Sequence, residues 1–196
     1  MFANRYTAYI DACSLAGALK RNLLLTLAEA EFYRVRWSDA VMQETGAAIR
    51  DMLNKREVPD AEQRGQLAVA AMIEAFEDAM VADYDDFLCV AGKLPDQGDA
   101  HVLAAALKTR AHVIVTDNMK HFPADTLKLL NIEARTTDEF LANTITLNPG
   151  KAVSAIRMMR ERLKRPEKTP GQLFLDMEAS GLTATVDVLR PYEDSL

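Results

Sequence analysis

Four separated segments of the chain carry acidic residues in settings that suggest chemistry. The acids are Asp11 in YIDACSL, Glu44 in WSDAVMQET, Asp99 in DQGDAHVLAA and Asp117 in HVIVTDN. Carboxylates that converge at one place repel each other, which raises their pKa values and destabilises the fold. A divalent hard cation such as Mg²⁺ or Mn²⁺ removes this repulsion, and it binds carboxylate oxygens together with water and substrate phosphate. Because such an ion also lowers the pKa of bound water, the pattern is typical of phosphodiester hydrolysis.

Each acid also has an ordinary structural explanation when it is taken alone. Asp99 precedes an alanine-rich helix that it would cap, and Glu44 fits a solvated helix surface. Asp96 belongs to the turn sequence PDQG, so we expect it to be a turn residue that touches the outer shell of the site. His101 lies in the first turn of the same helix, and we expect it to support the site. Three histidines and two cysteines are too few and too scattered for a zinc site.

Alternating strands and helices must position these acids. Short runs rich in β-branched and aromatic residues predict strands at residues 6–10, 32–37, 85–90, 112–116 and 132–135. Periodic apolar segments predict helices at residues 15–27, 38–54, 60–76, 99–110, 124–130 and 137–142. This alternation predicts an α/β fold with a parallel sheet covered on both faces. Ligands of such sheets bind beyond the carboxyl ends of the strands, where Asp11, Asp117 and Asn118 lie.

The composition bounds the class of protein. A chain of 196 residues is long enough for one domain with a small appendage. No apolar run approaches the roughly 20 residues that span a bilayer, and the N-terminal segment does not resemble a signal peptide. We therefore expect a cytoplasmic protein without membrane contact, in which Cys13 and Cys89 are buried thiols. The net charge of −6 hides a basic strip over residues 151–168, with seven basic and two acidic residues.

The pattern changes after residue 148. Apolar residues recur at helical spacing over residues 153–163, Pro166 is expected to end this helix, and a second helix is expected from about Thr169 to Gly181. The final segment TATVDVL fits either a helix or a strand. We therefore predict a main domain at residues 1–148 and a helical C-terminal extension at residues 149–196.

The acidic segments resemble a known family. YIDACSL, WSDAVMQET, LPDQGDAHVLAAA and VIVTDNMKHFP are similar, in this order, to the signature segments of PIN domains, and more narrowly to those of VapC-type toxins of bacterial toxin–antitoxin modules. The resemblance covers residues 5–145 and implies a three-layer α/β/α sandwich. It also implies a Mg²⁺- or Mn²⁺-dependent endoribonuclease, often a homodimer and often inhibited by a small antitoxin. Asp11 and Asp99 would then be the principal metal ligands, with Glu44 acting through water or completing the shell.

The fourth position of the family pattern differs in this chain. PIN domains commonly carry Thr-x-Asp after their fourth strand, whereas this chain has Thr116, Asp117 and Asn118. Side chains alternate along an extended segment, so Asp117 and Asn118 are not expected to face the same ion. Some members of the family have T-x-N-x-x-D/H-F here, which makes Asn118 a variant compatible with activity. Whether Asn118 or Asp117 completes the site, and whether one ion or two bind, is left open.

Other functions fit some of these features. A degenerate PIN module that binds RNA or a partner protein without cleavage is the main alternative, because Asn118 is a weaker ligand than a carboxylate. Phosphotransfer proteins of the haloacid-dehalogenase or receiver type also place Asp at strand ends, but DACSL lacks the second acid of the former and the chain lacks the lysine of the latter. The basic helix, with Arg157, Arg160 and Lys164, either guides the RNA backbone, docks an antitoxin or is simply solvated.

Overall fold

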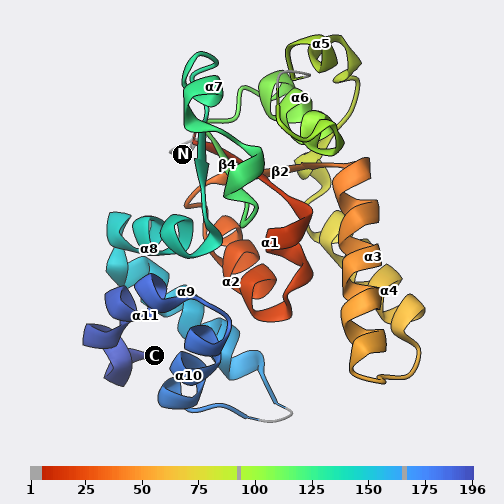
Figure 1. Cartoon of the computed structure of the whole chain (residues 1–196). Coiled ribbons are helices and arrows are strands. Elements are labelled where there is room, and N and C mark those ends of the chain that lie inside the picture. The colour runs from red at the N-terminus through yellow and green to blue at the C-terminus, as the bar shows by residue number, and fades with distance from the viewer. Residues whose placement is uncertain (1–5, 92–93, 165–166) are drawn as a thin grey trace.

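The computed structural model describes residues 6–91, 94–164 and 167–196. Its centre is a sheet of five parallel strands in the order β3-β2-β1-β4-β5, as Figure 1 shows. The strands are β1 (Thr7–Ile10), β2 (Arg34–Ser38), β3 (Met80–Val81), β4 (Val113–Val115) and β5 (Glu133–Arg135). In register, Tyr9 of β1 lies opposite Arg36 of β2 and Ile114 of β4. The carboxyl ends of β1 and β4 are therefore neighbours at one edge of the sheet.

Helices cover both faces of this sheet. In Figure 1 helix α6 lies above the sheet, whereas α1 and α2 lie below it. The helices are α1 (Ala12–Ala16), α2 (Ala18–Glu29), α3 (Asp39–Lys55), α4 (Ala61–Ala75), α5 (Leu88–Ala91), α6 (Ala100–Lys108), α7 (Ala124–Lys128), α8 (Thr137–Leu147), α9 (Pro149–Arg162), α10 (Pro170–Ala179) and α11 (Thr183–Leu189). The arrangement confirms the predicted α/β/α sandwich with C-terminal helices.

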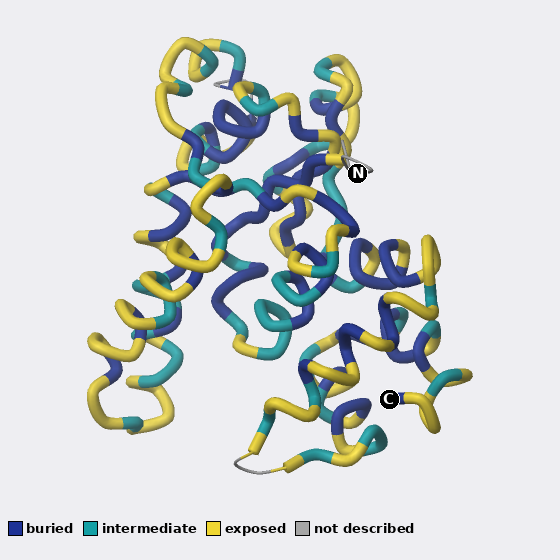
Figure 2. The backbone as a smooth tube through the Cα atoms, turned by 180° about the vertical axis from the view of Figure 1, so that it is seen from behind, coloured by how far each residue is buried: buried dark blue, intermediate teal, exposed yellow. Residues whose placement is uncertain are grey.

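The central strands are short and buried along their whole length. All four residues of β1 and all three of β4 are buried, because helices cover the sheet above and below. Figure 2 shows the buried backbone concentrated in the sheet and in the helix faces turned toward it. Tyr9, Trp37, Leu103 and Ile114 are fully buried in this core. The edge at which β1 and β4 end thus continues directly from the buried core.

Two expectations about local structure were wrong. Residues 85–90 do not form a strand: Asp85–Phe87 is a 3₁₀ turn that leads into α5, and the third strand is instead Met80–Val81. The apolar residues in this segment fit a helix as well as a strand, so periodicity could not separate the two. The cysteines are not both buried either, since Cys13 is half-buried and Cys89 is exposed.

The C-terminal segment consists of α9, α10 and α11, which Figure 1 shows in blue at the lower end of the molecule. The ambiguous segment TATVDVL is helical and forms α11. Helix α9 ends at Arg162, and the expected helix stop at Pro166 lies outside the described residues. Among the described residues, no helix has both the length and the apolar character needed to cross a membrane.

Candidate functional site

Asp11 is fixed at the carboxyl end of β1. Its side chain is buried, with 4% exposure, and its Oδ1 accepts a hydrogen bond from the backbone N–H of Ala12 at 2.7 Å, which caps α1. Its Oδ2 accepts hydrogen bonds from Thr116 Oγ1 at 2.7 Å and from Cys13 Sγ at 3.1 Å. Burial and the charge of Asp11 raise the pKa of the Cys13 thiol to about 11, so the thiol stays protonated and donates. These contacts hold the Asp11 carboxylate in one orientation.

Asp99 forms a cluster with two other polar side chains. His121 Nδ1 lies 2.6 Å from Asp99 Oδ2 and 3.7 Å from Asp96 Oδ2. One ligand atom from each of the three side chains lies within 4.8 Å of the other two. Burial is the main cause that raises the pKa of Asp99; the hydrogen bond from His121 opposes this effect, and the charges of Asp11 and Asp96 add to it. The carboxylate of Asp99 is therefore close enough to Asp11 for the two to repel each other.

Asp96, rather than Asp99, makes a capping contact, at the start of the 3₁₀ turn Gln97–Asp99 that leads into α6. Asp96 Oδ1 accepts a hydrogen bond from Gly98 N at 2.9 Å, which confirms that it is a turn residue. Asp99 stands directly before α6, yet within the described chain no backbone N–H of that helix binds its side chain. The expectation that the Asp99 side chain would cap this helix was therefore wrong. Its carboxylate is turned toward His121 and is available to a cation.

Glu44 reaches the same region from α3. Its side chain is half exposed, and its Oε1 lies 3.5 Å from His101 Nε2, an ion-pair distance rather than a short hydrogen bond. The other ring nitrogen of His101, Nδ1, lies 2.8 Å from the carbonyl oxygen of Gly98. The contact with Glu44 is the main cause that raises the pKa of His101; burial opposes it, and the more distant charge of Asp11 acts in the same direction as Glu44. His101 thus links Glu44 to the turn that carries Asp99.

The residues after β4 point in two directions. Thr116 faces Asp11, to which its hydroxyl donates at 2.7 Å, and the backbone N–H of Asn118 donates to Thr116 Oγ1 at 3.0 Å. Asp117 is turned away: its Oδ2 binds Lys20 Nζ at 2.7 Å and its Oδ1 accepts from Thr137 N at 3.0 Å. Burial raises the pKa of Asp117, but these two contacts more than offset it and leave the pKa below its usual value. The structure thus turns Asp117 toward Lys20 and α8 and does not bring it to Asp11 and Asp99, in contrast to the expectation that it could complete the site.

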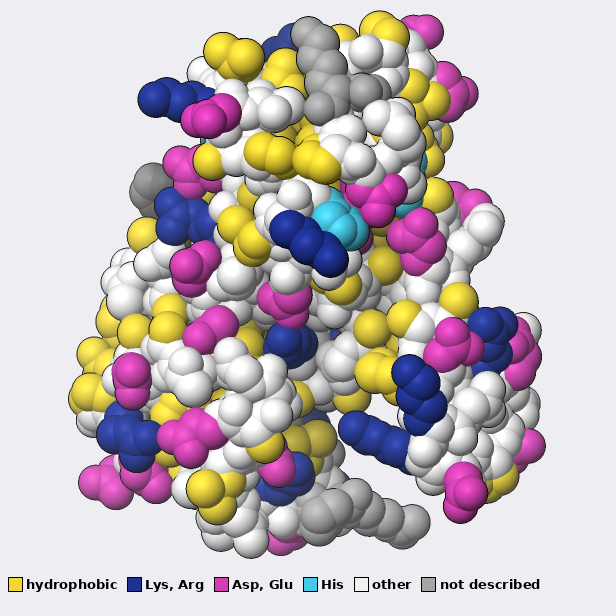
Figure 3. All heavy atoms as spheres, viewed as in Figure 1, with side chains coloured by type: hydrophobic (Ala, Val, Ile, Leu, Met, Phe, Trp, Pro, Cys, Tyr) yellow, Lys and Arg dark blue, Asp and Glu magenta, His cyan; other side chains and the backbone are white. Residues whose placement is uncertain are grey.

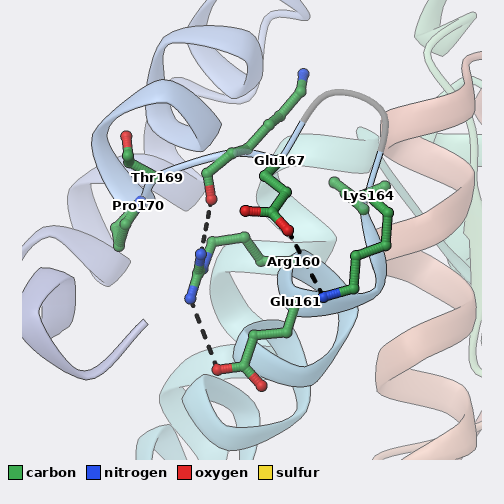
Figure 4. Close-up of a pocket in the computed structure, with 8 residues that line it drawn as sticks. Arg160, Glu161, Lys164, Glu167, Thr169 and Pro170 are labelled. Atoms are coloured by element: carbon green, nitrogen blue, oxygen red, sulfur yellow. Dashed lines mark hydrogen bonds and ion pairs between the residues drawn. The ribbon is translucent and has the colours of Figure 1, made fainter.

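The three basic residues predicted to bind RNA, on α9 and the segment after it, differ in their solvent exposure and in their partners. Figure 4 shows Arg160 between α9 and the segment before α10, where it donates to the carbonyl oxygen of Lys168 at 2.7 Å and lies 3.7 Å from Glu161. It also donates to the carbonyl oxygen of Leu196 at 2.8 Å. Arg160 thus holds the C-terminal segment together, and its role in RNA binding stays a prediction. Arg157, paired with Glu161 at 2.9 Å, and Lys164, paired with Glu167 at 3.9 Å, are exposed.

His121 is the site residue that sequence reasoning missed. His121 is the last residue of the short 3₁₀ turn Met119–His121, which follows β4. This turn brings its ring to Asp99, the residue directly before α6. Its signal was present in TDNMKHFP, because the histidine lies at the last polar position of T-x-N-x-x-D/H-F. On the face shown in Figure 3, histidine and acidic side chains lie next to one another.

Comparison with known proteins shows the family to which the sequence belongs. Residues 7–120, more than half of the chain, match the sequence profile of the PIN domain. The chain belongs to the PIN-domain family. This membership confirms the resemblance inferred from the acidic segments. Asp11, Glu44, Asp99 and Asn118 all lie inside the matched PIN domain, as do Asp96 and His101.

A second match covers the C-terminal part. Residues 137–191 match the profile described as the VapC50 C-terminal domain. A protein of Mycobacterium tuberculosis (strain ATCC 25618 / H37Rv) named "Putative ribonuclease VapC50" is 44% identical over 76 residues, which is 39% of this chain and 45% of that relative. The match thus spans less than half the length of the relative. No solved structure matches the chain.

Proposed function

We propose that the protein is a metal-dependent endoribonuclease and the toxin of a type II toxin–antitoxin pair. The observation that supports this proposal is the convergence of two carboxylates at one edge of the sheet. Asp11 is buried and held by Thr116, and its charge raises the pKa of Asp99. A PIN domain with mutually repelling, pre-oriented carboxylates is suited to bind a divalent cation and a phosphate group.

The donor chemistry fits Mg²⁺ or Mn²⁺. Asp11 and Asp99 would hold the ion, and Glu44 would complete the set of carboxylates. Carboxylate oxygens suit these hard ions better than they suit softer metals. His121 Nδ1 donates to Asp99 Oδ2 and thereby orients that carboxylate, as partners of metal ligands commonly do. When bound, the ion supplies positive charge that neutralises charge developing on the scissile phosphate.

The side chains around the ion position the reacting groups. Thr116 donates to Asp11 Oδ2 and accepts from Asn118 N, so it fixes the loop after β4 against the end of β1. His101 keeps Glu44 beside the turn that carries Asp99. In-line attack of water on the phosphate would leave a 3′-hydroxyl and a 5′-phosphate. The negative charge of the site would repel RNA, so basic residues outside it, including Arg157 and Lys164, are proposed to attract the backbone.

The cellular setting follows from the same proposal. The substrate is RNA, the partner is a small antitoxin, the protein forms a homodimer, and it acts in the cytoplasm. The similarity to a relative whose name includes ribonuclease supports the substrate class. We further propose that residues 1–148 form the nuclease domain and that residues 149–196 form a helical extension.

Substitution of Asp11 tests the proposal. Asp11→Asn keeps the shape of the side chain and one oxygen acceptor, for either Ala12 N or Thr116, but removes the charge that would bind the cation. We expect RNA cleavage in Mn²⁺ to fall by more than about a hundredfold and growth inhibition on expression to disappear. Asp51→Asn, an exposed site on α3 that pairs with Arg50, is the matched control and is expected to leave both unchanged. A folded Asp11→Asn protein that cleaves RNA at the wild-type rate would refute the nuclease proposal.

A second candidate function rests on Asn118. Its neutral side chain follows the strand end where the family commonly has a carboxylate, which favours a module that binds RNA without cutting. Calorimetric titration with Mn²⁺ separates the two functions, because a module that only binds RNA needs no ion. A saturable Mn²⁺ site that Asp99→Asn abolishes supports the nuclease.

A further inference from the structure

The first turn of α8 contacts the active-site edge through Thr137. The backbone N–H of Thr137 donates to Asp117 Oδ1 at 3.0 Å, and its Oγ1 donates to Ser14 Oγ at 2.8 Å. Ser14 in turn donates to the carbonyl oxygen of Val115 at 3.2 Å. Thr137 and Ser14 are both fully buried. Thr137 of α8 is therefore linked to the end of β4 by two routes, directly to Asp117 and through Ser14 to Val115.

The next residue of α8 contacts the C-terminal helices. The two carboxylate oxygens of Asp138 accept from the backbone N–H groups of Ala184 at 2.9 Å and Thr185 at 2.8 Å, and from Thr185 Oγ1 at 2.7 Å. These N–H groups lie in the first turn of α11, where a helix has unpaired donors and attracts negative charge. Asp138 thus fixes the start of α8 to the start of α11, although 46 residues separate it from Ala184.

The contact between Asp117 and α8 bears directly on the active site. Asp117 lies between Thr116, which donates to Asp11, and Asn118, whose N–H donates to Thr116. Because neighbouring side chains of this segment face opposite ways, a shift of Asp117 toward α8 or away from it moves Thr116 and Asn118 relative to Asp11. Lys20 pairs with the second oxygen of Asp117, so the carboxylate is held between α2 and α8.

We propose that the first turn of α8 is a positioning element of the active site. Thr137 holds the loop after β4 through Asp117 and Ser14, while Asp138 holds the same turn against α11. The C-terminal helices thereby set the geometry in which Thr116 meets Asp11 and Asn118 meets Thr116. Asp117 and Asp138 are positioning residues that act through others. The proposal rests on the proposed nuclease function only for its effect on cleavage.

Asp138→Asn in the full chain tests this proposal. An amide that replaces the carboxylate presents an N–H donor to one of the two backbone N–H groups of α11, so the contact is lost while the side chain keeps its size. Asp176→Asn is the matched control, because Asp176 lies on α10 and pairs with Lys168 within the C-terminal segment. Hydrogen–deuterium exchange is measured over residues 115–122, together with the kcat and KM of RNA cleavage, at a temperature well below both melting transitions.

We expect Asp138→Asn to speed amide exchange over residues 115–122 roughly tenfold and Asp176→Asn to leave it unchanged. We also expect Asp138→Asn to lower kcat roughly tenfold to a hundredfold with little change in KM, because a small misplacement of catalytic groups slows chemistry without weakening binding. In an Asp117→Ala background, where Thr137 N has lost its acceptor, the same substitution should lower kcat by a smaller factor than in the wild type, because only the contact through Ser14 remains. Thr137→Val, which keeps the shape but removes the hydroxyl, should repeat the exchange result.

Some outcomes would overturn the proposal. If Asp138→Asn changes exchange only in α11, and its loop exchange and kcat match those of Asp176→Asn, the first turn of α8 does not position the site. If the wild-type protein does not cleave RNA, the proposed nuclease function fails instead, and the exchange measurement alone decides whether the C-terminal helices hold the loop.

Discussion

At the scale of single residues, burial and the charge of Asp11 disfavour the ionised form of Asp99, and a bound cation would favour it. Burial raises its pKa above the ordinary value of 3.8, the charge of Asp11 acts in the same direction, and the hydrogen bond from His121 opposes both. Between the ordinary and the raised pKa, the folded protein binds more protons at this residue than the unfolded chain does. The free energy of unfolding therefore falls as the pH rises through this window, and the contribution stays at its lowest level above it.

Asp99→Asn is expected to stabilise the metal-free protein at neutral pH. The amide has no charge to bury or to repel Asp11, and it still offers an oxygen to His121. The melting midpoint in a chelator should rise by about 2–4 °C for each kcal/mol that is relieved, and the difference from wild type should vanish at a pH where Asp99 is protonated. Added Mn²⁺ should raise the midpoint of the wild type but not that of the variant.

Calorimetry of both proteins, with and without Mn²⁺, checks this prediction. A lower midpoint of Asp99→Asn in chelator at pH 7 would show that the carboxylate stabilises the fold. Equal stabilisation of both proteins by Mn²⁺ would show that the ion binds elsewhere.

The sequence predicted the acids of this site better than it predicted their partners. Asp11, Glu44 and Asp99 could be named because each lies in a segment whose local pattern and order are recognisable. The contact of His121 with Asp99 joins residues 22 positions apart, and that of Asp117 with Thr137 joins residues 20 positions apart. Such contacts depend on how the elements pack, which local patterns do not encode.

At the scale of elements, α3 and α4 form a hairpin that carries Glu44 and packs through two glycines. A Cβ added to Gly65 of α4 would lie 2.8 Å from the carbonyl oxygen of Gly46 of α3. A Cβ added to Gly46 would meet only Val69 Cγ2, at 3.4 Å. The close approach of the two backbones thus needs a glycine at position 65 but tolerates a side chain at position 46.

Gly65→Ala should therefore destabilise the protein, while Gly46→Ala should not. In Gly65→Ala the helices must separate, which is expected to lower the free energy of unfolding by about 1–3 kcal/mol. Gly46→Ala should change it by less, or raise it by up to about 1 kcal/mol, because alanine favours a helix interior. Urea unfolding followed by circular dichroism measures both, and equal losses in the two variants would rule out the backbone contact as the cause.

The elements that the sequence missed have physical explanations. Strand β3 has two residues, Met80 and Val81, and such a run is too short to show alternation. Its pairing with Trp37 and Ser38 of β2 makes it a strand. The β-branched segment TATVDVL is a helix, and Asp138 accepts hydrogen bonds from N–H groups of its first turn. The short length of β3 and the distant hydrogen-bond partner of α11 made these two elements hard to predict, whereas the longer periodic segments were predicted correctly.

At the scale of the whole molecule, the basic strip near the end of the sequence places its cations in two different surroundings. Arg160 is inside the C-terminal helices, with a side chain 18% exposed, and it binds the carbonyl oxygens of Lys168 and Leu196. Arg157 and Lys164 pair with acidic neighbours at the surface. Net charge along the sequence could not distinguish the partly buried Arg160 from the exposed cations. The distinction predicts which substitutions affect stability and which affect association with RNA.

Arg160→Ala and Arg157→Ala should therefore affect different properties: the first should lower stability, and the second should change the salt dependence of RNA binding. Arg160→Ala leaves two carbonyl oxygens without their charged donor, so we expect it to lower the free energy of unfolding by about 1–3 kcal/mol. It should leave the salt dependence of RNA binding close to that of the wild type. Arg157→Ala should change the melting midpoint little but should reduce the slope of log K against log salt, since each lost phosphate contact lowers that slope by about 0.7 for single strands.

Thermal unfolding and fluorescence-monitored RNA binding at several salt concentrations measure both effects on the same preparations. Lys164→Ala is the companion to Arg157→Ala, because both cations are exposed and both have an acidic neighbour. If neither exposed cation changes the salt slope, α9 and its continuation do not contact RNA, and the acidic site must attract its substrate through other basic residues. If Arg160→Ala alone changes the slope at unchanged stability, the assignment of Arg160 to the interior of the C-terminal helices is wrong.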